Sequence, residues 1–147
     1  MATTLSTWLA AVRTTIAALV PTTATPSATF TVAPGLLSLA QEAEVADRMF
    51  EVAAVDGGGV DNYMNAALVG YLRPFEVRVR YDHLADEEDA QTRVLEDELK
   101  IANALITRAN WTANVQHVSY GGARREVTAP QFSIMTLTFE AACLESL

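Results

Sequence analysis

Two histidines and one cysteine are the side chains of this sequence best suited to proton transfer or nucleophilic attack: His83, His117 and Cys143. Imidazole exchanges protons near neutral pH, and a thiolate attacks when a neighbouring base or cation lowers the thiol pKa. None of the three residues has a partner at the spacing of a known catalytic motif, and no G-x-S-x-G or H-E-x-x-H sequence occurs. We therefore predict no catalytic residue and a protein that is not an enzyme.

Two short segments have the composition of ligand-binding loops without the spacing. The carboxylates from Asp86 to Asp89 lack the alternation and the glycine of a calcium loop, and acidic residues are expected at the positive end of a helix dipole. The glycines Gly57, Gly58 and Gly59 lack the lysine that follows in a phosphate-binding loop. We predict neither a metal site nor a cofactor and interpret the three glycines as a flexible loop.

Composition indicates one folded domain spanning residues 1–147. Half of the 147 residues are hydrophobic and 19% are charged, a balance that favours a packed interior over disorder. The formal net charge of −8 opposes sequence-independent binding of nucleic acid, which requires a broad basic surface. No apolar run approaches the roughly 20 residues of a membrane span, and a lone cysteine suits a reducing compartment. We expect a soluble domain in the cytoplasm.

Hydrophobic periodicity predicts two helices and two strands in the first 55 residues. Apolar residues from Thr4 to Val20 recur on one helical face, and a short strand is expected near Phe30-Thr31-Val32. Leu36 to Asp47 follows the helical period again, whereas Arg48 to Val55 alternates as a strand does. The segment from Val60 to Tyr71 has no clear period and is not assigned.

The clearest strand extends from Arg73 to Tyr81. Its apolar and charged residues fall on opposite faces, with Phe75, Val77, Val79 and Tyr81 on one and Glu76, Arg78 and Arg80 on the other. A sheet with one buried and one wet face is typical of antiparallel architecture.

A long amphipathic helix is predicted from about Glu87 to Ala109, with Asp86 as its N-cap. Its predicted core stripe consists of Val94, Leu95, Leu99, Ala102, Leu105, Ile106 and Ala109. This stripe is wide enough to pack across a sheet.

The remaining residues predict an antiparallel meander. Trp111 to Tyr120 and Arg124 to Thr128 alternate weakly, and Gly121-Gly122 between them is expected to form a turn. A final strand is expected from Gln131 to Ala142. The predicted fold class is therefore α+β, a mainly antiparallel sheet with an N-terminal helix and one long helix packed on it.

Without a catalytic motif, sheet edges, loops and charged strand faces are the expected functional surfaces, since open edges accept partner strands. The residues that we single out as a possible interface are Glu76, Arg78, Arg80, Gly57, Gly58, Gly59, Gly121, Gly122, Arg124 and Arg125.

The order of these elements resembles the tail terminator family of long-tailed bacteriophages and, more loosely, related tail-completion and neck proteins. The resemblance rests on the N-terminal amphipathic helix, the strand Arg48-Met49-Phe50-Glu51-Val52, the strand from Arg73 to Tyr81, the long helix and the closing strand from Phe132 to Phe139. It is a resemblance of pattern over most of the chain.

The resemblance implies a structural, non-catalytic subunit of a homohexameric ring in the tail or neck of a virion, assembled in the host cytoplasm. Such a ring caps the tail tube after polymerisation and joins it to the head-side connector. DNA would pass through its lumen without specific binding, and no membrane contact is implied.

Two alternatives stay open. One is a head–tail connector, a stopper or another neck protein. The other belongs to a different class, a small-ligand-binding or enzymatic α+β domain whose site is assembled from distant residues such as Asp82, His83 and His117.

Overall fold

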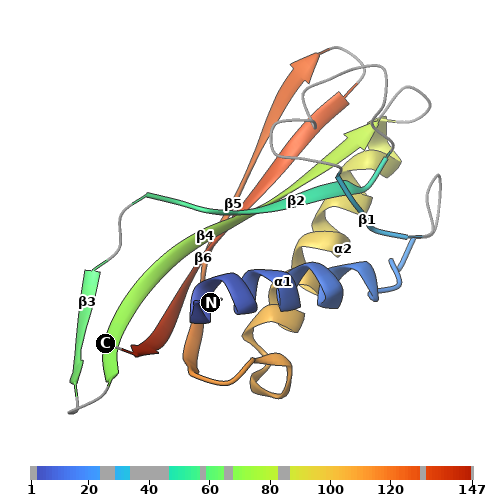
Figure 1. Ribbon diagram of the computed structural model, residues 1–147. Helices are drawn as coiled ribbons and strands as arrows, with labels where there is room; N and C mark the ends of the chain where they lie inside the picture. The colour runs from blue at the N-terminus through green and yellow to red at the C-terminus, as the bar shows by residue number, and fades with distance from the viewer. Residues whose placement is uncertain are drawn as a thin grey trace.

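Two helices lie on one face of a curved sheet (Figure 1). The computed structural model describes residues 3–23, 29–33, 47–56, 59–64, 68–82, 87–129 and 132–146. In chain order the main elements are α1 (Thr4–Ala17), β1 (Thr31–Val32), β2 (Met49–Ala54), β3 (Gly59–Met64), β4 (Leu68–Asp82), α2 (Glu87–Ile106), β5 (Val115–Ala129) and β6 (Phe132–Ser146). The predicted α+β class, with an N-terminal helix and a second helix packed on a mainly antiparallel sheet, is confirmed.

The sheet has the strand order β1-β2-β4-β6-β5, and β3 pairs with β4 off this path. β1 runs parallel to β2, and every other pairing is antiparallel. The central ladder joins β4 to β6 over their whole length, from Leu68 opposite Ser146 to Asp82 opposite Phe132. Because β6 occupies one side of β4 throughout, β2 and β3 lie on its other side, and β5 forms the opposite edge of the sheet.

Pro74 marks the place where β4 changes neighbours. β2 pairs with the second half of β4, and β3 pairs with its first half. Between these two ladders the carbonyl oxygen of Pro74 accepts a hydrogen bond of 3.0 Å from the backbone N–H of Val55. Proline has no N–H of its own, so it leaves no donor unpaired where β2 departs.

The core lies between the sheet and the two helices. The apolar face predicted for β4 is confirmed, since Phe75, Val77, Val79 and Tyr81 are all 0% exposed. Trp8 of α1 packs edge-on against the ring of Phe75 at 6.1 Å, and Phe75 stacks on Phe139 of β6 at 5.2 Å. Each fully buried side chain of this kind stabilises the fold by about 1.5–3 kcal/mol.

The predicted core stripe of α2 is only partly correct. Val94, Ala102 and Leu105 are buried, but Leu95 is 61% exposed and Leu99 is 71% exposed. From Gln91 onwards, where the burial of α2 is described, its other buried positions are Ile101 and two charged residues, Arg93 and Asp97. The charged residues are tolerated in the interior because oppositely charged side chains from the turn before β2 meet them, a pairing that helical periodicity cannot show. Ile106 is also exposed, and Ala109 lies beyond the helix.

The predicted turn at Gly121-Gly122 is wrong, because β5 continues through both glycines as one strand. The register against β6 shifts between Tyr120 and Gly122, so the glycines form a β-bulge. Gly122 has a φ of +111°, which side chains rarely adopt, and a Cβ on Gly121 would lie 3.0 Å from Oγ1 of Thr138. The bulge thus requires glycine at both positions, because one residue has a positive φ and the other lies too close to the neighbouring strand for a side chain.

Several boundaries differ from the predicted ones. α1 ends at Ala17 rather than Val20, and α2 ends at Ile106, with a short 3-10 helix at Arg108–Asn110 in place of its predicted last turn. The final strand extends to Ser146.

The unassigned stretch from Val60 to Tyr71 contains most of β3 and the start of β4. Gly59 begins β3 instead of lying in a loop, whereas Gly57 and Gly58 lie outside the described residues. The helix predicted over Leu36 to Asp47 also falls outside them, except for Asp47, which lies in the turn before β2.

Candidate functional site

The described residues of the alternative catalytic set do not meet. His117 is exposed on β5 opposite Ala142, whereas Asp82 lies opposite Phe132 at the other end of β6. Ten strand residues at about 3.3 Å each separate these positions by roughly 33 Å. His117 instead packs edge-on against Trp111 at 5.8 Å, and His83 lies outside the described residues.

Cys143 is a buried core residue of β6, 1% exposed. Burial raises the pKa of its thiol to about 11, and the negative charge of Glu145 contributes in the same direction. A thiol with a raised pKa is a poor nucleophile at neutral pH. The position therefore suits packing and not catalysis.

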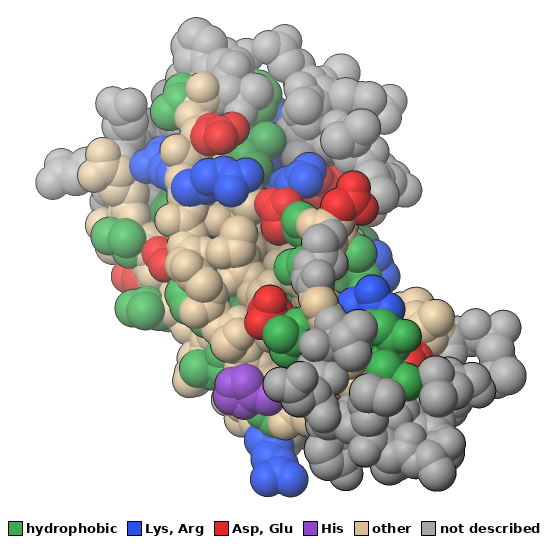
Figure 2. All heavy atoms as spheres, turned by 90° about the vertical axis from the view of Figure 1, so that its left-hand side faces the viewer, with side chains coloured by type: hydrophobic (Ala, Val, Ile, Leu, Met, Phe, Trp, Pro, Cys, Tyr) green, Lys and Arg blue, Asp and Glu red, His purple; other side chains and the backbone are tan. Residues whose placement is uncertain are grey.

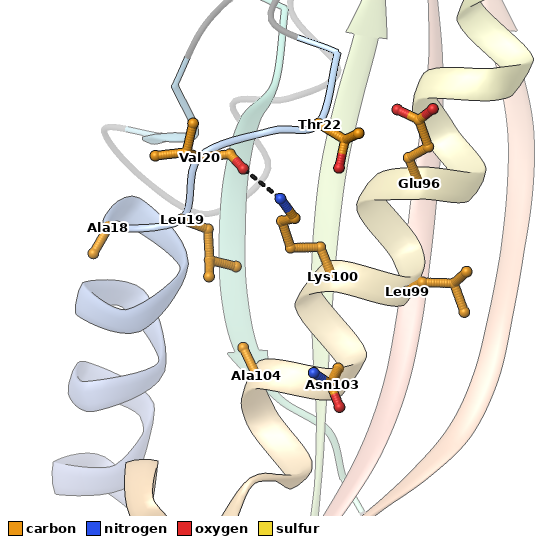
Figure 3. A pocket seen from close by; sticks show the side chains of 9 residues that line it. All are labelled: Ala18, Leu19, Val20, Thr22, Glu96, Leu99, Lys100, Asn103 and Ala104. Carbon is orange, nitrogen blue, oxygen red and sulfur yellow. Dashed lines mark hydrogen bonds between the residues drawn. The ribbon is translucent and has the colours of Figure 1, made fainter.

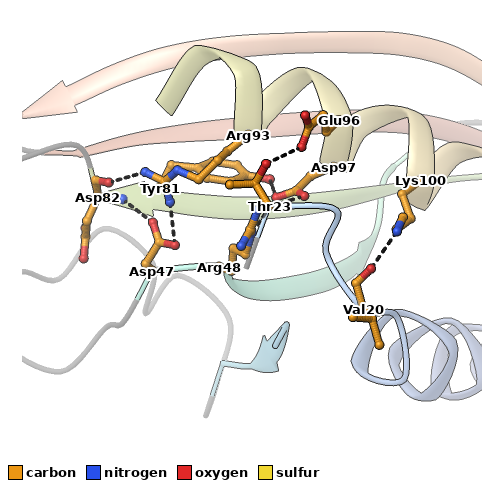
Figure 4. A network of polar contacts seen from close by, with 10 residues as sticks. All are labelled: Val20, Thr23, Asp47, Arg48, Tyr81, Asp82, Arg93, Glu96, Asp97 and Lys100. Atoms are coloured by element: carbon orange, nitrogen blue, oxygen red, sulfur yellow. Dashed lines mark hydrogen bonds and ion pairs between the residues drawn. The ribbon is translucent and has the colours of Figure 1, made fainter. Parts of the chain in front are cut away.

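The most concentrated charges of the interior form a polar network between α2, the start of β2 and the end of β4 (Figure 4). Arg48 and Asp97, both 0% exposed, form an ion pair through Nε and Oδ2 at 2.7 Å, with a second bond from Nη2 to Oδ1 at 3.2 Å. The hydroxyl of Tyr81 donates to the same carboxylate at 2.8 Å. Arg48 has a φ of +60°, a strained backbone that this fixed side chain helps to hold.

A second pair extends the network to the surface. Arg93 of α2 binds Oδ2 of Asp47 at 2.8 Å and the carbonyl oxygen of Asp82 at 2.9 Å. Asp47 also accepts the backbone N–H of Asp82 at 2.9 Å. Desolvation raises the pKa of Asp47 and Asp97, while the arginines act in the opposite direction.

In this network each of the four charged side chains has a charged partner. Buried charges that are paired and hydrogen-bonded specify one arrangement of elements. We interpret the network as a structural clamp that fixes α2 on the sheet.

The wet face of the sheet brings together three residues of the predicted interface. The row Glu51, Arg78 and Arg124 crosses the sheet in register, and Glu76 lies beside it. Arg78 binds Glu51 at 2.9 Å, and Glu76 lies 3.8 Å from Arg78 and 3.9 Å from Arg124. Basic and acidic side chains mix on this flank of the molecule, as Figure 2 shows. The face is therefore electrically balanced.

Two other arginines of the predicted interface do not belong to this group. Arg80, expected to be wet, is 3% exposed, because its guanidinium lies 3.9 Å over the ring of Phe132 and binds Asp82 at 3.1 Å. Arg125 lies on the helix side of β5, and its Nε donates to the hydroxyl of Ser133 at 3.0 Å. Alternation along the strand separates it from Arg124.

Grooves on both flanks of α2 define the surface that the sequence did not reveal. The first, about 810 Å³, lies between α2 and the chain that follows α1. Figure 3 shows Lys100 reaching across it to the carbonyl oxygen of Val20, a bond of 2.6 Å, while Leu99 points away from α1. The second groove, about 290 Å³, lies between α2 and β5 and is lined by Leu95, Arg125 and their neighbours.

The exposed apolar residues Leu95 and Leu99 form a ridge between these grooves. They are one helical turn apart, so their side chains lie side by side on α2. Large apolar side chains exposed together mark interaction sites more often than isolated ones. The ridge, the grooves and the edge of β5 are the candidate functional surface.

The described residues contain no cluster of three or more His, Cys, Asp or Glu side chains that could hold a metal ion. Among the same residues, no helix is both long and apolar enough to cross a membrane. No protein-family model matches the sequence, and no curated protein matches it.

Proposed function

We propose that this chain is a structural subunit of a ring that caps the tail tube of a long-tailed bacteriophage and joins it to the head-side connector. The ring is a homohexamer, is assembled in the host cytoplasm and stays in the virion, and it is not catalytic. DNA passes through its lumen without specific binding.

The observation that carries the proposal is the sheet with unpaired edges on opposite sides. β5 pairs only with β6, and on the far side β3 pairs only with β4, among the described residues. Two different edges on one subunit permit head-to-tail contacts, and such contacts generate a closed ring when the rotation closes. The order of helices and strands, on which the resemblance to tail terminators rests, supports the same role.

The charge of the chain also supports passage of DNA. At a net charge of −8 per subunit, a ring repels the phosphate backbone instead of holding it.

Electron microscopy of the purified chain, alone and with polymerising tail-tube protein from the same genome, tests the proposal. We expect six-fold rings and a ring at one end of each tube, together with tubes that stop growing. The double variant Leu95→Glu/Leu99→Glu alters the exposed ridge and is expected to weaken capping. A variant with the same added charge at the exposed residues Thr92 and Thr107 is the control.

A chain that neither forms rings nor binds or shortens tubes contradicts the proposal. Rings that bind only a purified head-side connector, and never the tube, would instead assign the chain to the connector or stopper group.

A further inference from the structure

The outer edge of one segment of β5 and the groove beside it have the geometry of a strand-acceptor site. From Gly122 to Val127, six successive residues pair in unbroken register with β6, between two bulges. β5 is the last strand of the sheet, so alternate N–H and C=O groups of this segment point away from the protein. An added strand can pair with such an edge.

The groove between β5 and α2 supplies places for the side chains of an added strand. Its walls include the apolar side chains of Val94, Leu95 and Met135. Val127, at the end of the free segment and on the helix side of β5, is 68% exposed. Recognition by strand addition combines main-chain hydrogen bonds with pockets for alternate side chains, and the edge of β5 and the groove offer a place for each.

Arg125 indicates which charge a strand added at this edge should carry. Its side chain is partly buried at the groove, and its bond to Ser133 uses only Nε and a neutral hydroxyl. Among the described residues no carboxylate forms an ion pair with it, whereas Glu98, on the same groove, binds the hydroxyl of Tyr120 at 2.6 Å. A partly buried guanidinium without a carboxylate favours an acidic partner.

A second copy of this chain meets these requirements. The chain has 18 acidic and 10 basic residues, so its own surface is rich in carboxylates. Its β3 stands apart from the helices at the far side of the sheet (Figure 1), where it pairs only with β4 among the described residues. β3 is antiparallel to β4, and β5 is antiparallel to β6, so β3 and β5 run in opposite directions. Copies placed side by side therefore continue the antiparallel sheet.

We propose that the free edge of β5 and the groove beneath α2 accept β3 of a neighbouring copy, with Arg125 bound to a carboxylate of that copy. This inference rests on the proposed function, because it names the contact through which ring subunits join. The interface is head to tail, and every subunit both donates and accepts a strand.

Analytical ultracentrifugation of the full chain and of two charge-reversal variants tests the contact. Arg125→Glu is expected to weaken association about tenfold or more. Arg108→Glu makes the same change of charge on the exposed 3-10 helix and should assemble as the wild type does. Arg125→Gln, which removes the charge without reversing it, should have an intermediate effect. Circular dichroism of all variants checks that they are folded.

Hydrogen exchange supplies a readout that does not depend on substitution. Amides of Gly122 to Val127 and of Gly59 to Met64 should become protected together when the wild type assembles. Unchanged exchange at β5, protection of β5 without β3, or normal assembly of Arg125→Glu would overturn the proposal.

A wild type that is monomeric at all concentrations overturns this contact even if it caps tubes. Conversely, copies that join through β5 and β3 but never bind tubes reject only the tail function.

Discussion

Arg48 and Asp97 form the most deeply buried ion pair among the described residues. Both side chains are fully buried, and Tyr81 donates to the same carboxylate. Removing one partner leaves an uncompensated charge in the interior, whereas replacing both by apolar residues removes the charge problem. The pair therefore stabilises one arrangement of α2 rather than adding a simple increment of energy.

We expect Asp97→Leu and Arg48→Met each to lower the free energy of unfolding by about 3–5 kcal/mol. The double variant Arg48→Met/Asp97→Leu should lose clearly less than the sum of the two single losses. Urea unfolding followed by circular dichroism measures all three variants. Additive losses would contradict the coupling.

Cys143 gives the protein a pH dependence in the alkaline range. Its thiol pKa rises from an ordinary value of 9.0 to about 11 in the folded chain. Between these values the folded chain binds more protons than the unfolded chain, so the free energy of unfolding falls as the pH rises. The fall amounts to about 2–3 kcal/mol by pH 11. Burial raises the pKa of Tyr81 too, which adds a loss above pH 10.

Urea unfolding at several pH values from 8 to 11 measures this dependence. The variant Cys143→Ala lacks the thiol, so its stability should fall less steeply than that of the wild type. Parallel curves for the two proteins would show that the thiol does not titrate in this way.

At the scale of elements, α2 shows what helical periodicity omits. Leu99 is 71% exposed, while Leu105 on the same helix is 0% exposed. Leu99→Ala should change the free energy of unfolding by less than about 0.5 kcal/mol. Leu105→Ala should lower it by about 2–5 kcal/mol, because it leaves a cavity against the sheet. Thermal and urea unfolding compare the two variants. Equal losses of unfolding free energy would mean that both leucines belong to the core, as the sequence predicted.

The strands were the most predictable part of the fold. Alternation along β4 correctly separated Phe75 and Val77 from Glu76 and Arg78, because burial on one face of a strand depends on local spacing. The same alternation misplaced Arg80, since Phe132, far away in the sequence, helps to cover it. The spacing of residues in the sequence predicts which face of the strand each side chain lies on, but it does not show which distant residue covers that side chain.

The candidate surface was less predictable for the same reason. Glu76, Arg78 and Arg124 were singled out from their charge and do lie together, but they largely neutralise one another. Leu95 was assigned to the core, but it is 61% exposed on α2. The presence of both an aspartate and an arginine near the apolar stripe of this helix was the only feature of the sequence that could have indicated a different buried face.

At the scale of the whole molecule, one core and one central ladder predict a single cooperative unit. Trp8 of α1 lies in the core, and the ladder of β4 and β6 extends through the sheet. In the variant Trp111→Phe, Trp8 is the only tryptophan, and its fluorescence should change at the same urea concentration as the far-ultraviolet circular dichroism signal. Two separate midpoints would show that residues 1–147 do not unfold as one domain.

The central ladder also determines when the protein can form during synthesis. β4 pairs with residues that follow it by at least 50 positions, because its last residue, Asp82, lies opposite Phe132. At roughly 5–20 residues per second, a ribosome takes about 2.5–10 seconds to make that intervening chain. Throughout this interval the long edge of β4 that pairs with β6 has no native partner, so the nascent chain needs protection from aggregation before β6 emerges.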